Sequence, residues 1–152
     1  MATKKTAQGR GTFLLIPLGD GTFGYGRLLD DPNVAFYRYR TEQPEADLDK
    51  IAASPIAFTI ASRTAKTWEP IGRRELEEVL LKPVVRFSQD RADFRQCTIY
   101  DNHHNVRNAS PEECEGLEPA AVWEPSGVVQ RLLDVFAGRP NEDVEHMKVR
   151  RS

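Results

Sequence analysis

The chain has 152 residues, of which 39% are hydrophobic and 29% are charged, and its formal net charge is −2. This length is enough for one domain with its own core, and the composition is ordinary for a globular protein. No stretch approaches the ~20 apolar residues of a membrane-spanning helix, so we expect no membrane partner.

Charge is distributed unevenly along the sequence. The first ten residues hold three basic residues and no acidic one, and residues 142–152 hold three of each. Residues 11–141 therefore have 20 acidic and 15 basic residues. Because nucleic-acid affinity rests on contacts of Lys and Arg with phosphates, this acidic body argues against a nucleic-acid partner and suits a basic protein instead.

The N-terminus and the cysteine content predict a cytoplasmic protein. Residues 1–10 lack the apolar region of a secretory signal. Cys97 and Cys114 are too few for a disulfide framework, so we expect two half-buried free thiols. We expect residues 1–10 to be a disordered lead-in, residues 11–141 to be a single domain, and residues 142–152 to be a loose charged tail.

The strongest local signal is a β-hairpin over residues 11–29. Two runs rich in apolar and β-branched residues, 12–18 and 22–29, flank the sequence Gly-Asp-Gly, and Asp-Gly between such runs is typical of a hairpin turn. Gly24 and Gly26 lie on one face of the second run, which predicts a coiled strand or a close approach of another backbone. The hairpin therefore predicts a sharply curved sheet.

The middle of the chain alternates predicted strands and short helices. Residues 34–40 form a predicted strand with aromatic residues on both faces, which indicates either that both faces are covered or that the strand lies near a binding surface. The apolar run 56–61 indicates a buried strand. The spacing of apolar residues predicts helices over 45–53 and 73–81, the second with its face of Leu76, Val79 and Leu80 turned inward.

The C-terminal part continues this alternation. Strands are expected over 84–88 and 94–100, and a helix of about two turns after Ser110. The clearest helix is predicted over 125–137, with Gly138 as its C-cap. The predicted fold class is α+β: a strongly curved, mostly antiparallel sheet or a partly open β-barrel, with short helices and a C-terminal amphipathic helix.

Candidate catalytic residues are few. His103 and His104 lie side by side in a polar turn, and no third ligand stands at metal-binding spacing. We therefore expect no catalytic residue, no metal and no cofactor. A metal site or a hydrolase centre that combines a histidine with Cys97 or Cys114 is the competing hypothesis, and it needs an orienting group that no motif supplies.

Three blocks of sequence resemble the immunity protein 26 family, bacterial proteins thought to protect a cell from a toxin of its own polymorphic toxin system. The first joins Ile16-Pro17-Leu18, the Asp-Gly turn and Tyr25-Gly26-Arg27-Leu28-Leu29. The second is Thr67-Trp68-Glu69-Pro70-Ile71-Gly72, and the third runs from Pro111-Glu112-Glu113-Cys114 through Glu118 to Trp123. The likeness spans residues 11–140.

This resemblance implies a protein that neutralises a cognate toxin by direct stoichiometric binding. The sequence does not give the oligomeric state, and we expect a monomer. The acidic body adds that the toxin is a nuclease-type effector with a basic cleft. The residues expected to contact the toxin, chosen as exposed acids and aromatics, are Asp30, Asp31, Tyr37, Tyr39, Glu112, Glu113 and Glu115. A solvated helix face is the alternative for the three glutamates.

Other residues match the family motifs, and we expect them to have structural roles. They are Pro17, Gly26, Trp68, Gly72, Glu118 and Trp123. Glu118 is expected to pair with an arginine such as Arg27, and Trp123 to anchor the last helix on the sheet.

The alternative function is a small β-barrel module that binds nucleic acid or a peptide through stacked aromatic residues. Its platform would consist of Phe23, Tyr25, Phe36, Tyr37 and Tyr39. The acidic body argues against this alternative where the ligand is a nucleic acid.

Overall fold

The hairpin forms where the sequence predicts it. In this computed structural model, β1 (Thr12–Pro17) pairs antiparallel with β2 (Phe23–Leu28). Gly19 and Gly21 in the connecting turn have φ angles of +84° and +89°, which glycine adopts without the steric cost of a side chain. The turn is closed by a hydrogen bond from the backbone N–H of Leu18 to the carbonyl of Thr22.

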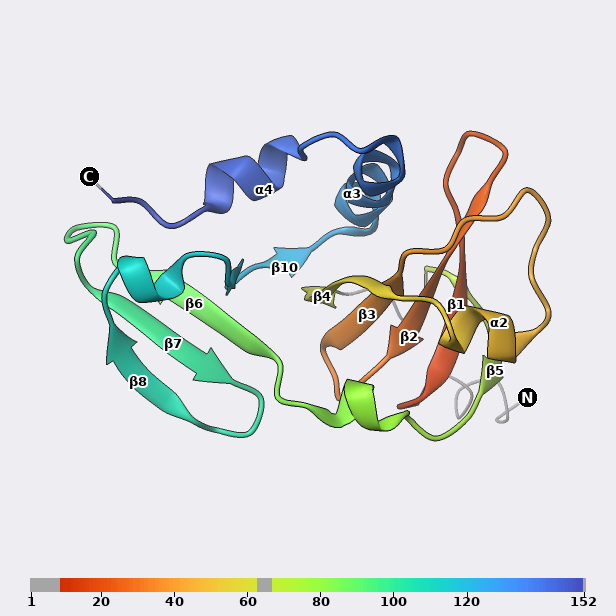
Figure 1. The fold of residues 1–152 in the computed structure, drawn as a ribbon, viewed down its shortest axis with the longest axis horizontal. Coiled ribbons are helices and arrows are strands. Elements are labelled where there is room, and N and C mark those ends of the chain that lie inside the picture. The colour runs from red at the N-terminus through yellow and green to blue at the C-terminus, as the bar shows by residue number, and fades with distance from the viewer. Residues whose placement is uncertain (1–8, 63–66, 152) are drawn as a thin grey trace. The chain divides into compact units, whose positions relative to one another are not determined.

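The structure describes residues 9–62 and 67–151, and these fall into two compact units (Figure 1). The first unit takes the described residues up to 81 together with 122–141, and the second takes 82–121 and the described residues from 142. Most of the expected lead-in, residues 1–10, lies outside the described residues. That residues 11–141 form one domain stays a prediction.

The first unit is built on a six-stranded sheet with the strand order β10-β4-β3-β2-β1-β5. Neighbouring strands are antiparallel, except that β10 runs parallel to β4. The other strands are β3 (Asn33–Tyr37), β4 (Ile56–Ser62), β5 (Glu69–Arg73) and β10 (Val122–Trp123). Every residue of β3 is buried, so both of its faces are covered, which confirms the prediction from its aromatic residues.

Two helices pack on opposite faces of this sheet. Ile51 of α2 (Leu48–Ala52) joins a buried cluster with Phe13 of β1 and Tyr25 of β2. On the other face, a Cβ added at Gly24 would lie 3.4 Å from a methyl group of Leu132, which belongs to α3 (Pro125–Ala137). Because residues alternate between faces along a strand, Tyr25 and Gly24 mark the two sides. The missing side chain at Gly24 therefore makes room for α3.

Helix α3 has the bounds that its apolar spacing predicts. Val128 and Leu132 are buried, and Gly138 ends the helix in the left-handed conformation, with φ +70° and ψ 30°. The Arg131 guanidinium lies 4.1 Å from the centroid of the Phe58 ring and 5.0 Å from that of Trp123, a cation–π arrangement that joins the helix to β4 and β10. No helix in the described ranges is long and apolar enough to cross a membrane.

The second unit is a four-stranded sheet with the strand order β8-β7-β6-β9. Its small core contains the buried residues Phe87, Cys97 and Cys114. The strands are β6 (Val85–Gln89), β7 (Cys97–Asp101), β8 (Val106–Ala109) and β9 (Glu118–Pro119), with the 3-10 turn η2 (Glu112–Cys114) and the helix α4 (Glu142–Met147).

The predicted fold class, α+β, is confirmed, but the β-barrel is wrong. The strands of the described residues form two separate sheets, and neither closes on itself. The strong curvature of the sheet stays a prediction. The sequence pattern also missed β8, because its residues Val-Arg-Asn-Ala show no apolar alternation.

Two predicted helices are reduced to single 3-10 turns, and α2 (Leu48–Ala52) is shorter than the helix predicted over 45–53. The helix over 73–81 is reduced to the 3-10 turn η1 (Glu78–Leu81), and Val79, expected to face inward, is 60% exposed. The helix after Ser110 is reduced to η2, because Glu115 is extended and Gly116 has φ +80°. The tail expected to be loose is instead helical over 142–147.

A buried arginine explains why the first of these helices does not form. Arg27 is 0% exposed, and its guanidinium donates to the carbonyl oxygens of Gly11 (2.8 Å), Arg74 (3.0 Å) and Glu75 (2.9 Å). The carbonyls of Arg74 and Glu75 are thereby engaged outside any helical ladder. Two further bonds reach the Tyr37 hydroxyl (3.2 Å) and the Glu77 carboxylate (2.7 Å).

These five bonds use all five N–H donors of the arginine side chain. The carboxylate partner of Arg27 is therefore Glu77 and not Glu118. Glu118 lies in β9 opposite another arginine, Arg86 of β6. Burial lowers the pKa of Arg86, and the charge of Glu118 opposes that shift.

Replacement of Arg27 tests how much this network contributes. Arg27→Met leaves three carbonyl oxygens without their donor, and unpaired buried polar groups cost about 1–3 kcal/mol each. We expect the free energy of unfolding to fall by at least about 3 kcal/mol in urea titrations. Arg38→Met, at an exposed arginine of the same unit, is the matched control and should change it by less than about 0.5 kcal/mol. Equal effects of the two substitutions would show that the network is dispensable.

Asp134 predicts how stability depends on pH. Burial raises the pKa of this carboxyl, but hydrogen bonds from Arg139, Asn141 and Gln130 outweigh burial and hold the pKa below its ordinary value of 3.8. A carboxyl with a lowered folded-state pKa stabilises the fold above its unfolded pKa and loses that contribution as the pH falls through the folded pKa.

Asp134→Asn should therefore flatten the loss of stability below about pH 4, measured by urea titration at successive pH values. Asp143→Asn is the control, since Asp143 is exposed and has no ion-pair partner in the part of the chain that the structure describes. A wild-type acid profile in the Asp134 variant would contradict this role.

Candidate functional site

The two tyrosines predicted to contact a toxin lie in different environments. Tyr37 is 1% exposed and accepts the bond from Arg27 inside the core, so we leave it out of any contact surface. Tyr39 is half-buried at the surface, just after β3. The alternative function needs exposed aromatic rings for stacking. Three of its five predicted residues, Tyr25, Phe36 and Tyr37, are buried, so they cannot form that platform.

Tyr39 belongs to a hydrogen-bond network that holds the loop after β3 against β2. Its hydroxyl donates to Oε1 of Glu45 at 2.6 Å, and its ring lies 5.5 Å from the ring of Tyr25. The Tyr25 hydroxyl in turn accepts from the backbone N–H of Glu45 at 2.8 Å and lies 2.6 Å from the hydroxyl oxygen of Thr41. The bond to Glu45, with burial, raises the pKa of Tyr39 to about 12, so this hydroxyl stays protonated and donating.

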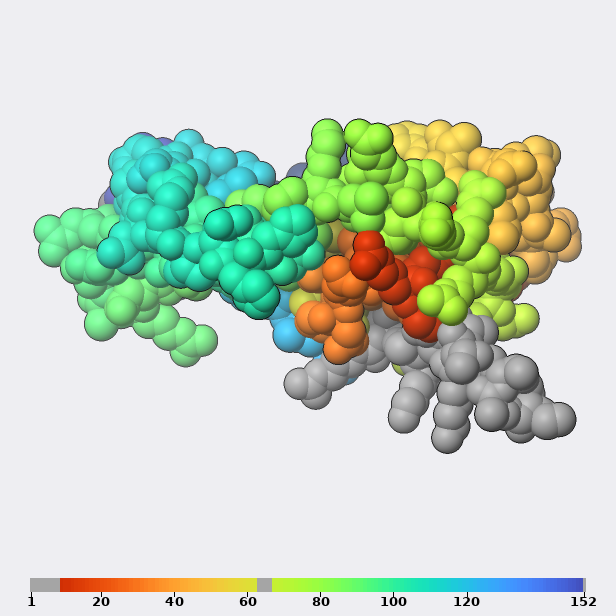
Figure 2. All heavy atoms as spheres, turned by 90° about the horizontal axis from the view of Figure 1, so that it is seen from below, coloured from red at the N-terminus to blue at the C-terminus, as the bar shows by residue number. Residues whose placement is uncertain are grey.

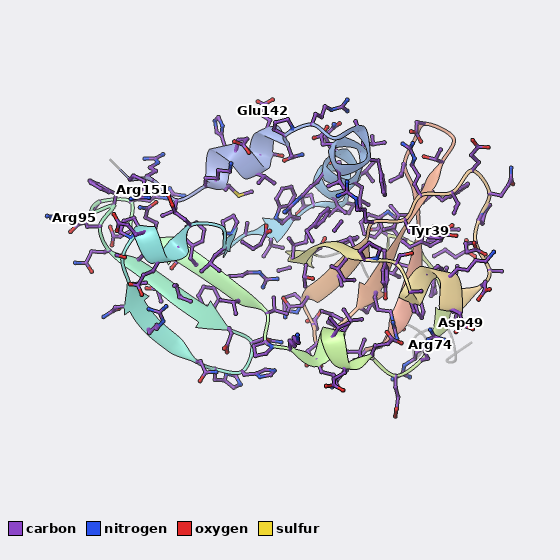
Figure 3. The ribbon with its side chains drawn as sticks, viewed as in Figure 1. Tyr39, Asp49, Arg74, Arg95, Glu142 and Arg151 are labelled. Carbon is purple, nitrogen blue, oxygen red and sulfur yellow. The ribbon has the colours of Figure 1, made fainter. Side chains whose placement is uncertain are left out.

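The loop held in this way is the most acidic short segment of the first unit. We call residues 41–49 the acidic loop, because it carries Glu42, Glu45, Asp47 and Asp49 within eight positions. The sequence analysis treated this stretch only as a helix start and missed its charge, although the spacing of the carboxylates was a visible signal. Figure 3 labels Tyr39, just before the acidic loop, and Asp49, at its end.

Part of the charge of the acidic loop is compensated within the unit. Asp49 accepts from Nη1 of Arg74 at 2.7 Å, and Asp47 caps α2 by accepting from the backbone N–H of Asp49. The Tyr39 bond lowers the pKa of Glu45, which therefore stays ionised. Glu42 is exposed and has no hydrogen-bond or ion-pair partner among the described residues. The loop thus combines three carboxylates that have partners, Glu45, Asp47 and Asp49, with the exposed carboxylate of Glu42.

Asp30 and Asp31 lie at the other end of the same strands. They occupy the turn between β2 and β3, whereas the acidic loop meets the start of β2, where Phe23 pairs with Thr41. A strand of six residues spans about 17 Å between its ends. The structure therefore separates Asp30 and Asp31 from the acidic loop and Tyr39. Both aspartates are exposed, and Asp30 lies 3.5 Å from Arg10.

The three predicted glutamates belong to the second unit and are largely neutralised there. Glu112 and Glu115 both pair with Arg151, and Glu113 pairs with Arg107 at 2.8 Å. Glu113 also accepts from the backbone N–H of Ser110, which closes the turn at η2. These contacts leave one excess negative charge at η2, which is a weaker patch than the sequence indicates. Figure 3 shows the position of Arg151.

The family-motif residues of the first unit lie mostly in its interior. Trp68 is buried and meets the Phe36 ring edge-on, with ring centroids 5.9 Å apart. A Cβ at Gly26 would lie 3.3 Å from the same Phe36 ring, and one at Gly72 would lie 2.6 Å from Leu48. These glycines make room for neighbouring side chains. Trp123 is buried on β10, and Pro17 is exposed at the end of β1.

A basic hollow on the first unit is largely occupied by its own contacts. It encloses about 570 Å³ beside Arg10, Arg73 and Arg74. Arg74 pairs with Asp49, Arg10 lies near Asp30, and Nε of Arg73 donates to the Arg10 carbonyl. Figure 2 shows the first described residues in red against the yellow-green segment that follows residue 66. The arginines are therefore engaged within the unit, which gives a nucleic acid no free basic groove here.

The cysteines and histidines are not brought together as a reactive site. Cys97 and Cys114 share the core of the second unit, while His103 and His104 are exposed in the turn after β7. Burial, with the neighbouring Cys97, raises the pKa of Cys114 to about 11. In residues 9–62 and 67–151, no three His, Cys, Asp or Glu side chains are grouped so that they could hold a metal ion.

The described residues fold as an α+β protein with two sheets, and the acidic loop lies between β3 and α2 and enters the first turn of α2. Residues 9–98 match the family model of immunity protein 26. Because this match covers more than half of the 152 residues, the chain belongs to the immunity protein 26 family. The membership confirms the resemblance and implies an immunity protein of a toxin system. Neither the curated proteins nor the solved structures gave a match.

The buried thiols give a test of the competing enzyme hypothesis. A nucleophilic cysteine needs a thiolate, and a buried thiol with a pKa of about 11 is almost fully protonated at pH 7. We expect both cysteines of the native chain to react with a thiol reagent such as DTNB at least about 100-fold more slowly than in the unfolded chain. Rapid reaction of either thiol in the native chain would revive a catalytic role.

Proposed function

We propose that this protein neutralises a cognate bacterial toxin by covering it in a direct, stoichiometric complex. The observation that carries the proposal is membership of the immunity protein 26 family. The two thiols are buried, and His103 and His104 are exposed and are not grouped with them. This arrangement supports a mechanism that works by binding rather than by catalysis. The toxin belongs to a polymorphic toxin system, and the complex forms in the cytoplasm between a monomer of this protein and one toxin domain.

The acidic loop with Tyr39 is the part of the first unit that best fits a basic partner. The network of Tyr39 and Tyr25 holds Glu45 in place, so little conformational entropy is lost at this residue when a partner binds. Glu42 and Tyr39, three positions apart in sequence, offer a charged and an aromatic contact, and aromatic residues are enriched among interface anchors. Asp30 and Asp31 form a second contact of the same sign.

The acidic character of the body supports a nuclease-type toxin. Enzymes that act on nucleic acid hold phosphates with Lys and Arg, so their active sites are basic clefts. An acidic surface steers toward such a cleft and occludes it. The glutamates Glu112, Glu113 and Glu115 contribute less to this attraction, because Arg107 and Arg151 compensate them.

Co-expression with the toxin encoded by the neighbouring gene tests the proposal. We expect the pair to be recovered as a complex and the host cell to survive expression of the toxin. Neither complex nor protection would overturn the proposed function. Protection from a toxin without nuclease activity would keep the function and remove the nuclease assignment.

Charge variants of the acidic loop and of the turn between β2 and β3 test where the toxin binds. Glu42→Gln and Asp31→Asn should each slow association by about two- to fivefold at low salt and leave dissociation nearly unchanged, because exposed charges act mainly on the encounter. Added salt should remove the difference. Glu124→Gln, at an exposed glutamate of the same unit, is the control. Association rates that are identical in all three variants, measured by surface plasmon resonance, would place the contact elsewhere.

A further inference from the structure

A second hollow, on the second unit, has features that the toxin-binding proposal does not use. It encloses about 520 Å³ between the β6–β7 hairpin and the segment after α4. Figure 1 shows α4 leading into the C-terminal segment, and the backbone of Arg150 in that segment meets Gln89 of β6. We propose that this hollow is a binding site for a short acidic peptide segment that carries an apolar side chain.

The lining of the hollow combines an apolar floor with a basic rim. Phe87 is buried beneath it, while Phe94 is 37% exposed and Met147 is half-buried. The rim carries Arg91 and Arg150, both exposed. An apolar side chain of a ligand can therefore be buried against the rings and the thioether, while its carboxylates reach the guanidinium groups.

The two arginines are available to a ligand. In the part of the chain that the structure describes, neither the Arg91 nor the Arg150 guanidinium has a hydrogen-bond or ion-pair partner. Lys148, also in the lining, already pairs with Glu145 at 3.0 Å. The one acidic residue of the lining, Asp90, is engaged by the backbone N–H groups of residues 92 and 93. The free charge at the rim is therefore positive.

The walls of the hollow are fixed before any ligand binds. The side-chain amide of Gln89 donates to the backbone carbonyl of Arg150 at 2.9 Å, and its carbonyl accepts from the backbone N–H of the same residue at 2.9 Å. Val149 packs on the core of the second unit, and Arg151 pairs with Glu112 and Glu115. Such preorganisation reduces the entropic cost of binding.

A peptide fits this chemistry better than a nucleic acid does. The second unit as a whole has 10 acidic and 8 basic residues, so a long polyanion is repelled outside the hollow. A single exposed phenylalanine also offers no series of stacking positions for successive bases. A peptide of a few residues places its charges only at the two arginines.

This site is independent of the proposed function. The main toxin contacts that we propose, the acidic loop with Tyr39 and the pair Asp30 and Asp31, lie in the first unit, whereas every lining residue of this hollow lies in the second unit. Failure of peptide binding would therefore leave the toxin proposal untouched, and failure of toxin binding would leave this one.

The test uses the full chain and three labelled probes in fluorescence anisotropy. The first is the peptide EEDLFDEE, the second is EEDGSDEE, which has the same charge without the apolar pair, and the third is oligo-dT of eight nucleotides. We expect saturable binding of the first peptide, at least about tenfold tighter than of the second. Equal affinity for the two peptides, tighter binding of oligo-dT, or no saturation up to millimolar peptide would overturn the proposal.

Variants locate the binding in the hollow. The double variant Arg91→Ala/Arg150→Ala should weaken binding of the first peptide at least about tenfold, and it keeps the Gln89 bonds because they involve the backbone of Arg150. Phe94→Ala should weaken it to a similar extent. Arg95→Ala removes a charge from the same hairpin, where the side chain pairs with Asp93 outside the lining (Figure 3), and should change the affinity less than about twofold.

Amide NMR spectra of each variant, compared with the wild type, identify any variant that has lost its fold. If Arg95→Ala weakens binding as much as the double variant does, the attraction is a general charge effect and the site is not in this hollow.

Discussion

The first unit depends on one buried cation. Arg27 lies near the end of β2 without contact with solvent, and each of its five donors has a partner. A guanidinium in a protein interior is tolerated only when its hydrogen bonds are fully satisfied and a counter-charge is near. Here the partners come from the residue before β1, from the end of β3 and from the segment 74–77. The arginine thus joins four parts of the chain that are distant in sequence.

This constraint also shapes the surface. The carbonyls of Arg74 and Glu75 accept from Arg27, and the segment 74–77 is irregular rather than helical. The Arg74 side chain is then free to reach Asp49 in the acidic loop. Tyr39 and Tyr25 hold the same loop at Glu45. A buried charge network and a surface network therefore meet at the acidic loop, and a rigid scaffold carries the carboxylates that we assign to toxin binding.

Local patterns in the sequence were enough for some elements. The Asp-Gly turn located the hairpin, and the apolar spacing with its glycine cap located α3, because these signals depend on residues that are close in sequence. They failed where a distant residue decided the outcome. Nothing near residues 73–81 indicates that an arginine about 50 positions earlier binds their carbonyls. Tyr37 was predicted to lie on a contact surface, but it is buried in a cluster with Phe13 and Ile51 from other parts of the chain.

The candidate site was predicted less well than the fold, for a related reason. Counting charges along the sequence identified an acidic body, but it did not show which carboxylates are compensated. Glu112 and Glu115 meet Arg151, which lies 36 or more positions away, whereas Glu42 has no partner in the described ranges. The family match gives the role of an immunity protein, and the structure adds where exposed charge remains.

The most direct test of the central claim, that this protein acts by covering its toxin, is a titration of purified cognate toxin with the purified chain while toxin activity is followed. A covering mechanism predicts a linear loss of activity that ends at one chain per toxin molecule and a complex of the same ratio by light scattering. Activity lost at a small fraction of that ratio would mean that the chain destroys or modifies the toxin catalytically. Activity retained at excess chain would mean that it does not act on the toxin at all.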